Sequence, residues 1–321
     1  MQVYLGLDIG SVSTNIAILT GDGTVMDTLY IRTQGKPIEA VQQALGHIRD
    51  THPQLDIIGV GTTGSGRELI GIVVGADSIK NEITAHAVAA LHIVPEVQTV
   101  LEIGGQDSKI MLMRNGVVTD FAMNTVCAAG TGSFLDQQAA RLNVPIEKFG
   151  DIALQSRTPV RIAGRCAVFA ESDMIHKQQA GHPLPDILNG LCQSLVRNYL
   201  NNLGKGKQIT GPILFQGGVA ANKGMHRAFE EALGQPIIIP PHFNVMGAVG
   251  AALLAQEAVQ SQQKKSLFRG FEVADFSYHP TSIECSGCAN CCEIVKLHMN
   301  GQPIGCWGDR CGKWSSAVTV A

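Results

Sequence analysis

Aromatic side chains are scarce in this sequence, and a long apolar segment is absent. Aromatic residues make up 5% of the 321 positions, whereas glycine occupies 36 of them. No stretch approaches the roughly 18 to 20 uninterrupted apolar residues that a membrane helix needs. The N-terminal MQVYLGLDIG also lacks a basic region ahead of its apolar stretch. We therefore expect a cytoplasmic protein with no membrane partner.

The sequence also lacks an excess of charge of one sign. Its 24 basic and 27 acidic side chains give a formal net charge of -3, and no Lys/Arg block interrupts the chain. A surface that binds nucleic acid or anionic lipid needs concentrated positive charge. The sequence therefore predicts no nucleic-acid partner.

A P-loop is missing, and no G-x-G-x-x-G stands between a strand and a helix as a dinucleotide site requires. Instead, Gly6-Leu-Asp8-Ile-Gly10 places an acid at a predicted strand end, ahead of hydroxyls in a hairpin turn. Backbone N–H groups in such a turn bind phosphate oxygens, and Asp8 can hold a hydrated Mg²⁺. A related strand end, Glu102-Ile-Gly104-Gly105, is followed by Gln106 and Asp107, which are suited to orienting an attacking water.

The two acidic strand ends indicate an internal duplication. Leu7–Gly10 aligns with Leu101–Gly104, and a third strand end, Ile213–Gly218, has the glycines without the acid. The pattern predicts strands over 3–8, 14–19, 24–31 and 55–60 and helices over 37–48, 186–203 and 244–258. One glycine loop alone is as typical of a structural turn as of a site, but three favour phosphate binding. The candidate ATP and Mg²⁺ ligands are Gly10, Ser11, Ser13, Thr14, Glu102, Gly104, Gly105, Lys109, Gly130, Thr131, Gly132, Gly217, Gly218 and Asn222, with Asp8, Gln106 and Asp107 as catalytic candidates.

The paired DIG and EIGGQD loops, with GGVAAN and the GAVGAALLA helix, resemble the acetate/sugar kinase, heat-shock ATPase and actin superfamily. Within it, the chain resembles the activators of 2-hydroxyacyl-CoA dehydratases and the ATPase subunits of benzoyl-CoA reductases over residues 3–258. The supporting motifs are GTTGSGR at 61–67, NEITAHA at 81–87, NTVCAAGTGSFLD at 124–136 and AGRCAVFAESD at 163–173. The resemblance implies a two-lobed, actin-like α/β fold with duplicated mixed-sheet domains and ATP in the cleft. We expect a first lobe over 1–95, closed by a helix at 244–259, and a second lobe over 96–259.

Two cysteines distinguish this resemblance from ordinary kinases. Cys127 lies in a loop that leads into a helical pattern, and Cys166 stands at a predicted helix start. Helix N-termini favour thiolates and anionic groups. A 4Fe–4S cubane takes about four thiolate ligands, so two cysteines from each of two chains predict a homodimer with one bridging cluster. Residue type alone favours buried structural cysteines, and the resemblance reverses that preference. Cys192, on an apolar helix face, is expected in the core.

The remaining cysteines crowd into the last 55 residues. We expect a linker at 260–266 and a small cysteine-rich metal-binding module at 267–321, because so short a segment needs a metal to compensate for a small core. Four or more of six thiols should bind either zinc or an iron–sulfur cluster, with disulfides as the less favoured alternative. The six are Cys285, Cys288, Cys291, Cys292, Cys306 and Cys311.

The resemblance implies an ATPase coupled to electron transfer. A ferredoxin or flavodoxin would reduce the bridging cluster, and an acceptor iron–sulfur enzyme would take the electron: a 2-hydroxyacyl-CoA dehydratase, a benzoyl-CoA reductase core or a double-cubane-cluster protein. A small-molecule kinase of the same superfamily is the alternative, and a nucleotide-dependent scaffold is a third. The sequence leaves Glu82 and His86 open between a cleft and a solvated face, and Arg67 between a phosphate contact and a stabilising salt bridge.

Overall fold

The computed structural model describes residues 1–315 and divides into two compact units. Unit 1 combines residues 1–86 with the chain from Gly247 onward, and unit 2 covers residues 87–246. The sequence predicts a first lobe over 1–95 that is closed by a helix at 244–259. The observed boundaries fall within α3 (Glu82–Ile93) and at the start of α9 (Met246–Gln262). Close packing explains this: a Cβ on Gly250 of α9 would lie 1.8 Å from the Ala85 carbonyl oxygen, so α9 and the first turn of α3 stay together.

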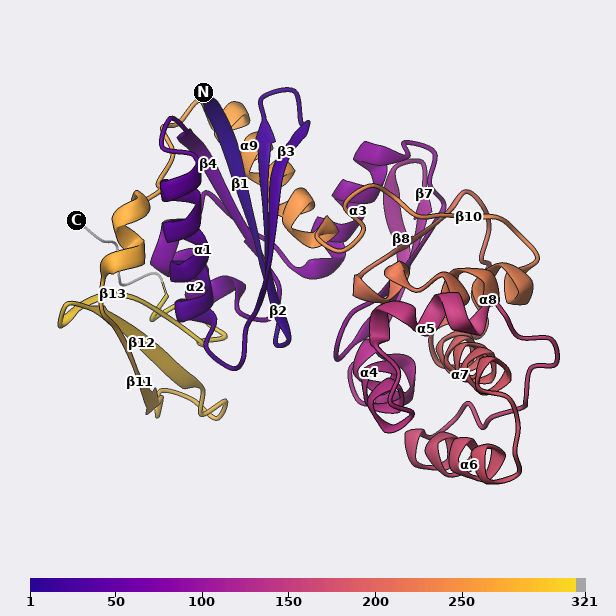
Figure 1. The fold of residues 1–321 in the computed structure, drawn as a ribbon. Helices are drawn as coiled ribbons and strands as arrows, with labels where there is room; N and C mark the ends of the chain where they lie inside the picture. The colour runs from indigo at the N-terminus through magenta and orange to yellow at the C-terminus, as the bar shows by residue number, and fades with distance from the viewer. Residues whose placement is uncertain (316–321) are drawn as a thin grey trace. The chain divides into compact units, whose positions relative to one another are not determined.

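Unit 1 is built on a five-stranded mixed sheet in the order β3-β2-β1-β4-β5 (Figure 1). The first three strands form an antiparallel meander, and β4 and β5 run parallel to β1. The predicted strands and the first helix are confirmed. The bounds are β1 Gln2–Ile9, β2 Ser13–Thr20, β3 Val25–Arg32, α1 Pro37–Thr51, β4 Asp56–Thr63, α2 Arg67–Val74 and β5 Ser78–Ile79.

Alternation along β1 assigns the two faces of this sheet. Leu5 and Leu7 join the buried cluster that includes Val41 and Leu45 of α1, whereas Gly6 points to the opposite face. A Cβ on Gly6 would lie 1.9 Å from the Ala248 carbonyl oxygen of α9. Because successive side chains of a strand point to opposite faces of the sheet, α1 covers one face and α9 covers the other.

Unit 2 repeats this topology in a sheet of order β10-β9-β6-β7-β8. Again three strands form an antiparallel meander and two run parallel, which confirms the duplicated α/β fold. The bounds are β6 Thr99–Ile103, β7 Ser108–Arg114, β8 Val117–Asn124, η1 Ala128–Gly130, α4 Gly132–Arg141, α5 Ile146–Ala153, α6 Ala167–Gln179, α7 Leu184–Tyr199, η2 Leu200–Gly204, β9 Ile213–Gln216, η3 Gly218–Ala221, α8 Lys223–Leu233 and β10 Ile237–Ile238.

After α9 the chain forms η4 (Phe271–Asp275) and a C-terminal sheet of three antiparallel strands. These are β11 (Tyr278–Glu284), β12 (Glu293–Met299) and β13 (Gln302–Trp307). The segment shares the core of unit 1: Val273, Leu297 and Ile304 are buried in the same cluster as the β1 and α1 side chains. The expected linker is also anchored, because the Asp77 carboxylate accepts hydrogen bonds from the Ser266 hydroxyl and the Leu267 N–H.

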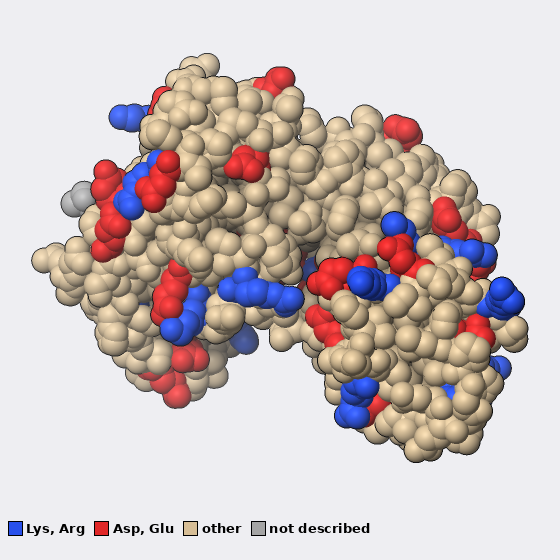
Figure 2. Space-filling view, viewed as in Figure 1, with Lys and Arg blue, Asp and Glu red and all other residues tan. Residues whose placement is uncertain are grey.

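Charge is dispersed over the visible surface. Figure 2 shows Lys and Arg side chains interspersed with Asp and Glu, with no extended region of one sign on that face. Among residues 1–315, no helix is both long enough and apolar enough to cross a membrane.

Candidate functional site

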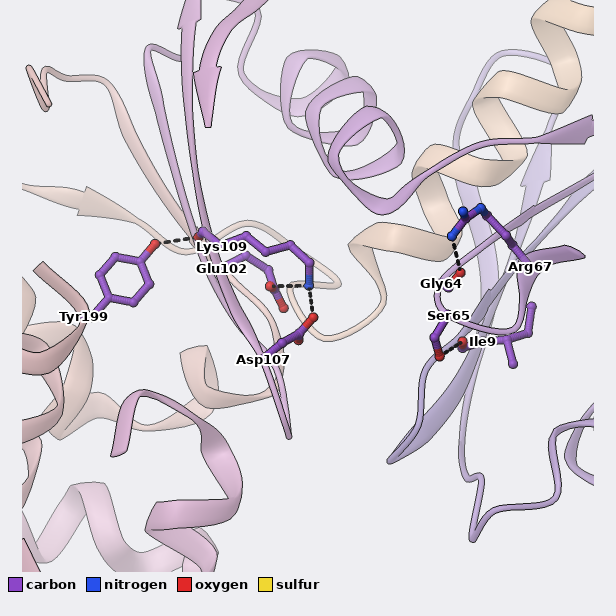
Figure 3. Close-up of polar contacts among 8 residues, drawn as sticks. All are labelled: Ile9, Gly64, Ser65, Arg67, Glu102, Asp107, Lys109 and Tyr199. Carbon is purple, nitrogen blue, oxygen red and sulfur yellow. Dashed lines mark hydrogen bonds and ion pairs between the residues drawn. The ribbon is translucent and has the colours of Figure 1, made fainter. Parts of the chain in front are cut away.

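The turn after β1 is fixed by hydrogen bonds from the GTTGSGR loop (Figure 3). The Gly10 N–H donates to the Ser13 carbonyl oxygen at 2.9 Å, which closes the β1–β2 turn. The Ser65 hydroxyl donates to the Ile9 carbonyl oxygen at 3.2 Å. Gly64 has φ of +88°, and a Cβ there would lie 2.4 Å from the same oxygen. Only glycine therefore lets this second loop approach the candidate phosphate turn so closely.

Asp8 lies beside the start of α9. A Cβ on Gly247 would lie 2.2 Å from Asp8 Oδ2 and 3.3 Å from His86 Nε2. The absence of a side chain at Gly247 thus leaves room for both polar groups. The structure brings the sequence candidates Asp8 and His86 to the same helix start, within unit 1.

Two further candidates in unit 1 have structural contacts of their own. The buried Thr14 hydroxyl lies 3.0 Å from the Thr33 hydroxyl, so it takes part in the hydrogen bonding of the meander. The Arg67 guanidinium donates to the Gly64 carbonyl oxygen at 3.1 Å and lies 3.5 Å from the Glu68 carboxylate. Both residues stabilise the local loop geometry around the end of β1.

The second acidic strand end, in unit 2, contains a buried ion-pair group. Lys109 is 2% exposed, and its ammonium lies 3.1 Å from Glu102 and 2.7 Å from Asp107 (Figure 3). The Tyr199 hydroxyl donates to the Lys109 carbonyl oxygen at 2.5 Å, and burial raises the pKa of Tyr199 well above its ordinary value. One ammonium group thus contacts two carboxylates at this strand end.

Three glycine loops meet at this second strand end. The Gly132 and Ser133 N–H groups both donate at 2.9 Å, to the carbonyl oxygens of Gly104 and Gly105. Gly217 has φ of +89°, and a Cβ on it would lie 2.3 Å from the Ile103 carbonyl oxygen. The predicted phosphate loops at 104–105, 130–132 and 217–218 therefore converge in space.

Two candidates in these loops use their side chains for hydrogen bonds to the local backbone. The Thr131 hydroxyl donates to the Ala128 carbonyl oxygen at 2.8 Å. Asn222 caps α8, because its side chain accepts the Met225 N–H at 3.1 Å. The Gln106 side chain, in contrast, is exposed at the turn after β6.

The two candidate cluster cysteines lie close together in unit 2. Cys166 is the N-cap residue of the 13-residue helix α6, and the Cys127 sulfur lies 3.9 Å from the carbonyl oxygen of the adjacent Arg165. The Asn124 side chain holds the Cys127 backbone, accepting its N–H at 2.9 Å and donating to its carbonyl oxygen at 2.8 Å. Both thiols are partly exposed.

Exposed apolar side chains flank these cysteines. Val126 is 95% exposed, and Val168 and Phe169 on the first turn of α6 are 69% and 67% exposed. Large apolar groups that gather at an exposed surface typically mark an interaction site.

The remaining cysteines divide into core and C-terminal groups. Cys192 is fully buried, as expected, and burial raises the pKa of its thiol to about 12. The six C-terminal cysteines lie on or beside the C-terminal sheet. Within residues 1–315 the side chains do not place three potential ligands at metal-binding separations.

Sequence reasoning missed Asn198 and Gly247. Asn198 lies in a buried position of α7, where a lone Asn gives no sequence signal beyond its polarity. Gly247 belongs to the small-residue run of the α9 pattern, and nothing local indicates that Asp8 lies against it. Both contacts join residues far apart in the chain, so only the fold reveals them.

Comparisons with known proteins agree with this geometry. The BadF/BadG/BcrA/BcrD ATPase family matches residues 5–255. The (R)-2-hydroxyglutaryl-CoA dehydratase activating ATPase of Acidaminococcus fermentans is 37% identical over 79% of this chain and 98% of its own length. A benzoyl-CoA reductase component of Thauera aromatica is 27% identical over 79% and 93%. The solved activator of the 2-hydroxyisocaproyl-CoA dehydratase from Clostridium difficile, with bound ADPNP, matches with a TM-score of 0.73 and 33% identity over 81% of this chain and 97% of that one.

Proposed function

The chain belongs to the BadF/BadG/BcrA/BcrD ATPase family, and we propose on that premise that it is an ATP-driven activator delivering low-potential electrons to an iron–sulfur enzyme. The observation that carries the proposal is the pairing of Cys127 and Cys166 on one exposed, partly apolar surface. An ordinary small-molecule kinase has no use for such a pair.

Nucleotide-binding groups are assigned to the glycine loops of unit 1 and, separately, to those of unit 2. Asp8 would bind hydrated Mg²⁺, and backbone N–H groups of the loops at 10–13, 104–105 and 217–218 would bind phosphate oxygens. Gln106 and Asp107 would orient the water that attacks the terminal phosphate. Asp107 is supported in this role by Lys109, which fixes its carboxylate at 2.7 Å.

The thiols suit a bridging 4Fe–4S cluster shared by two chains. Cys166 lies at a helix N-terminus, where partial positive charge stabilises an anionic group. The Asn198 amide lies 3.7 Å from the Cys127 sulfur and supplies a further donor. When bound, a 4Fe–4S cluster accepts and releases one electron. Two cysteines per chain complete a four-thiolate set only in a homodimer, and Val126, Val168 and Phe169 offer the apolar contact surface for it.

Coupling of ATP hydrolysis to electron transfer requires that the bound nucleotide changes the arrangement of the two protomers in the dimer. ATP and ADP must bind two conformations with different affinity, since a ligand that binds both equally shifts nothing. A reduced ferredoxin or flavodoxin would supply the electron. The acceptor would be a dehydratase or reductase of the kind that the relatives' names specify.

The assignment is tested by the variants Cys127→Ser and Cys166→Ser of the full chain, purified anaerobically. Each should lose four irons per dimer relative to the parent, because symmetry removes two of the four thiolates at once. The variants should still bind ATP and should dimerise more weakly. Parental iron content in both variants, or the same loss in Cys192→Ser, would contradict the bridging cluster.

A further inference from the structure

The loop between β11 and β12 brings two cysteines face to face. Glu284 and Glu293 are the last paired residues of the two strands, and the Cys285 N–H donates to the Cys292 carbonyl oxygen at 2.8 Å just beyond them. Residues opposed in this way point to the same face, with Cβ atoms about 4.5 to 5.5 Å apart. Cys285 and Cys292 are therefore spaced to share one metal centre.

The other two cysteines of this loop differ from each other. Cys288 is exposed near the tip of the loop. Cys291 has φ of +42°, and its sulfur turns back to within 3.9 Å of the Cys288 carbonyl oxygen. The Cys291 thiol is thus engaged with the Cys288 backbone, and within residues 1–315 Cys291 has no partner across the strand pair of the kind that joins Cys285 to Cys292.

A second loop, 308–315, closes over the same end of the sheet. It starts beside β12, since a Cβ on Gly308 would lie 2.2 Å from the Glu293 carbonyl oxygen. The Asp309 carboxylate accepts the Trp314 N–H at 2.7 Å and so bends the loop back. The Trp314 indole then donates to the Cys285 sulfur at 3.4 Å. Cys311 lies in the bend between these contacts.

Cys306 lies too far along the sheet to share this centre. It is paired with Lys296, four residues from Cys292, which corresponds to about 13 Å along a strand. Two thiolates on one zinc ion, with Zn–S bonds of about 2.3 Å, are at most about 4.6 Å apart. Cys306 is also buried, and its thiol donates to the Trp314 carbonyl oxygen at 2.9 Å.

Donors to sulfur are already in place around Cys285. The Gly287 N–H and the Trp314 indole N–H both donate to the Cys285 sulfur. Such N–H groups are the contacts that orient and stabilise ligating thiolates in metal sites.

We propose that Cys285, Cys288, Cys292 and Cys311 form a tetrathiolate site for one thiophilic centre, a zinc ion or an iron–sulfur cluster, and that Cys291 and Cys306 are not ligands. Side-chain rotation and closure of the two loops bring the four sulfurs together on metal binding. The C-terminal sheet packs on α2 at Gly305, where a Cβ would lie 2.5 Å from the Ile72 side chain. The sheet that carries the centre is therefore packed on the core of unit 1.

The test uses the full chain carrying Cys127→Ser and Cys166→Ser, so that only the C-terminal thiols can hold the metal. The anaerobic protein is supplied with Zn²⁺, or with Fe²⁺ and sulfide, and metal and acid-labile sulfide per chain are measured after gel filtration. We expect either one zinc, or about four irons with equal sulfide. Adding Cys285→Ser or Cys292→Ser should lower metal retention at least tenfold, whereas Cys291→Ser and Cys306→Ser should leave it unchanged.

Two results would overturn this assignment. One is a parent that retains neither metal. The other is a loss of metal from Cys306→Ser equal to that from Cys285→Ser. ATP binding and thermal unfolding are measured for every variant to exclude misfolding as the cause of metal loss. If Cys285→Ser does not fold, Cys311→Ser on the exposed loop replaces it and should lower metal retention in the same way.

Discussion

The Nδ2 atom of Asn198 lies 3.7 Å from the Cys127 sulfur and 2.7 Å from the Gly164 carbonyl oxygen. One buried amide on α7 thus connects the two loops that carry Cys127 and Cys166. Gly130 makes room for it, because a Cβ there would lie 2.7 Å from Asn198 Oδ1. The separation of the two candidate ligands is therefore set by a residue that is itself no ligand.

Asn198→Ala should destabilise both the fold and the bound iron. Removing the donor leaves the Gly164 carbonyl oxygen without this partner, which costs about 1 to 3 kcal/mol of unfolding free energy. Iron should also be released faster to a chelator, because the cysteine loops separate more easily. The matched control is Asn201→Ala, an exposed neighbour, which should match the parent in both measurements. Equal iron release from the two variants would remove Asn198 from this role.

Gly247→Ala should impair ATP hydrolysis, whereas Gly46→Ala should not. An alanine Cβ at 247 would lie 2.2 Å from Asp8 Oδ2 and must displace the carboxylate, but at position 46 of α1 it meets nothing within 4 Å. We expect a loss of roughly 10² in turnover for Gly247→Ala, similar to removal of a metal-binding group. Gly46→Ala should stabilise the protein by about 0.5 to 1 kcal/mol. Steady-state phosphate release and thermal unfolding measure both effects, and a parental rate for Gly247→Ala would contradict the placement.

Leu297→Ala should show that the C-terminal sheet stabilises unit 1. Leu297 is fully buried in the core of this unit, so truncation costs about 2 to 5 kcal/mol through lost burial and a cavity. Leu267→Ala is the control, since that side chain is 68% exposed and its loss should change stability by at most about 0.5 kcal/mol. Denaturant unfolding compares the two, and equal midpoints would indicate that the sheet is only loosely attached.

The thiols should differ in the pH at which they become reactive. A lowered pKa gives Cys285 more thiolate near neutral pH than an ordinary thiol, whereas Cys192, with a pKa of about 12, has a thiolate fraction of about 10⁻⁴ at pH 8. In metal-free protein, iodoacetamide should therefore modify Cys285 increasingly as pH rises from 6 to 8, and Cys192 only after unfolding. Peptide mass spectrometry after timed alkylation measures the rate at which each cysteine is modified. Modification of Cys192 at the rate of Cys285 in folded protein would count against these environments.

Local patterns were sufficient for much of the fold. Apolar patterns predicted four strands and the first helix of unit 1, and the repeated acid-Ile-Gly strand ends predicted the internal duplication that the second sheet shows. What the patterns missed depends on contacts distant in sequence. Gly250 packs on Ala85 and Val273 joins the core of unit 1, and neither contact has a signal in the local sequence. Spacing alone likewise could not separate Cys292 from Cys306; the strand register does so.

The most direct test of the central claim is nucleotide-dependent electron transfer to a purified 2-hydroxyacyl-CoA dehydratase. The reduced protein is mixed with the acceptor under anaerobic conditions, and acceptor reduction and phosphate release are followed together. We predict that electrons pass only with Mg-ATP, that Asp8→Asn and Asp107→Asn lower both rates by roughly 10², and that Asp151→Asn, an exposed control, leaves them unchanged. Electron transfer at the same rate without nucleotide, or at the parental rate in Asp8→Asn, would contradict an ATP-driven activator.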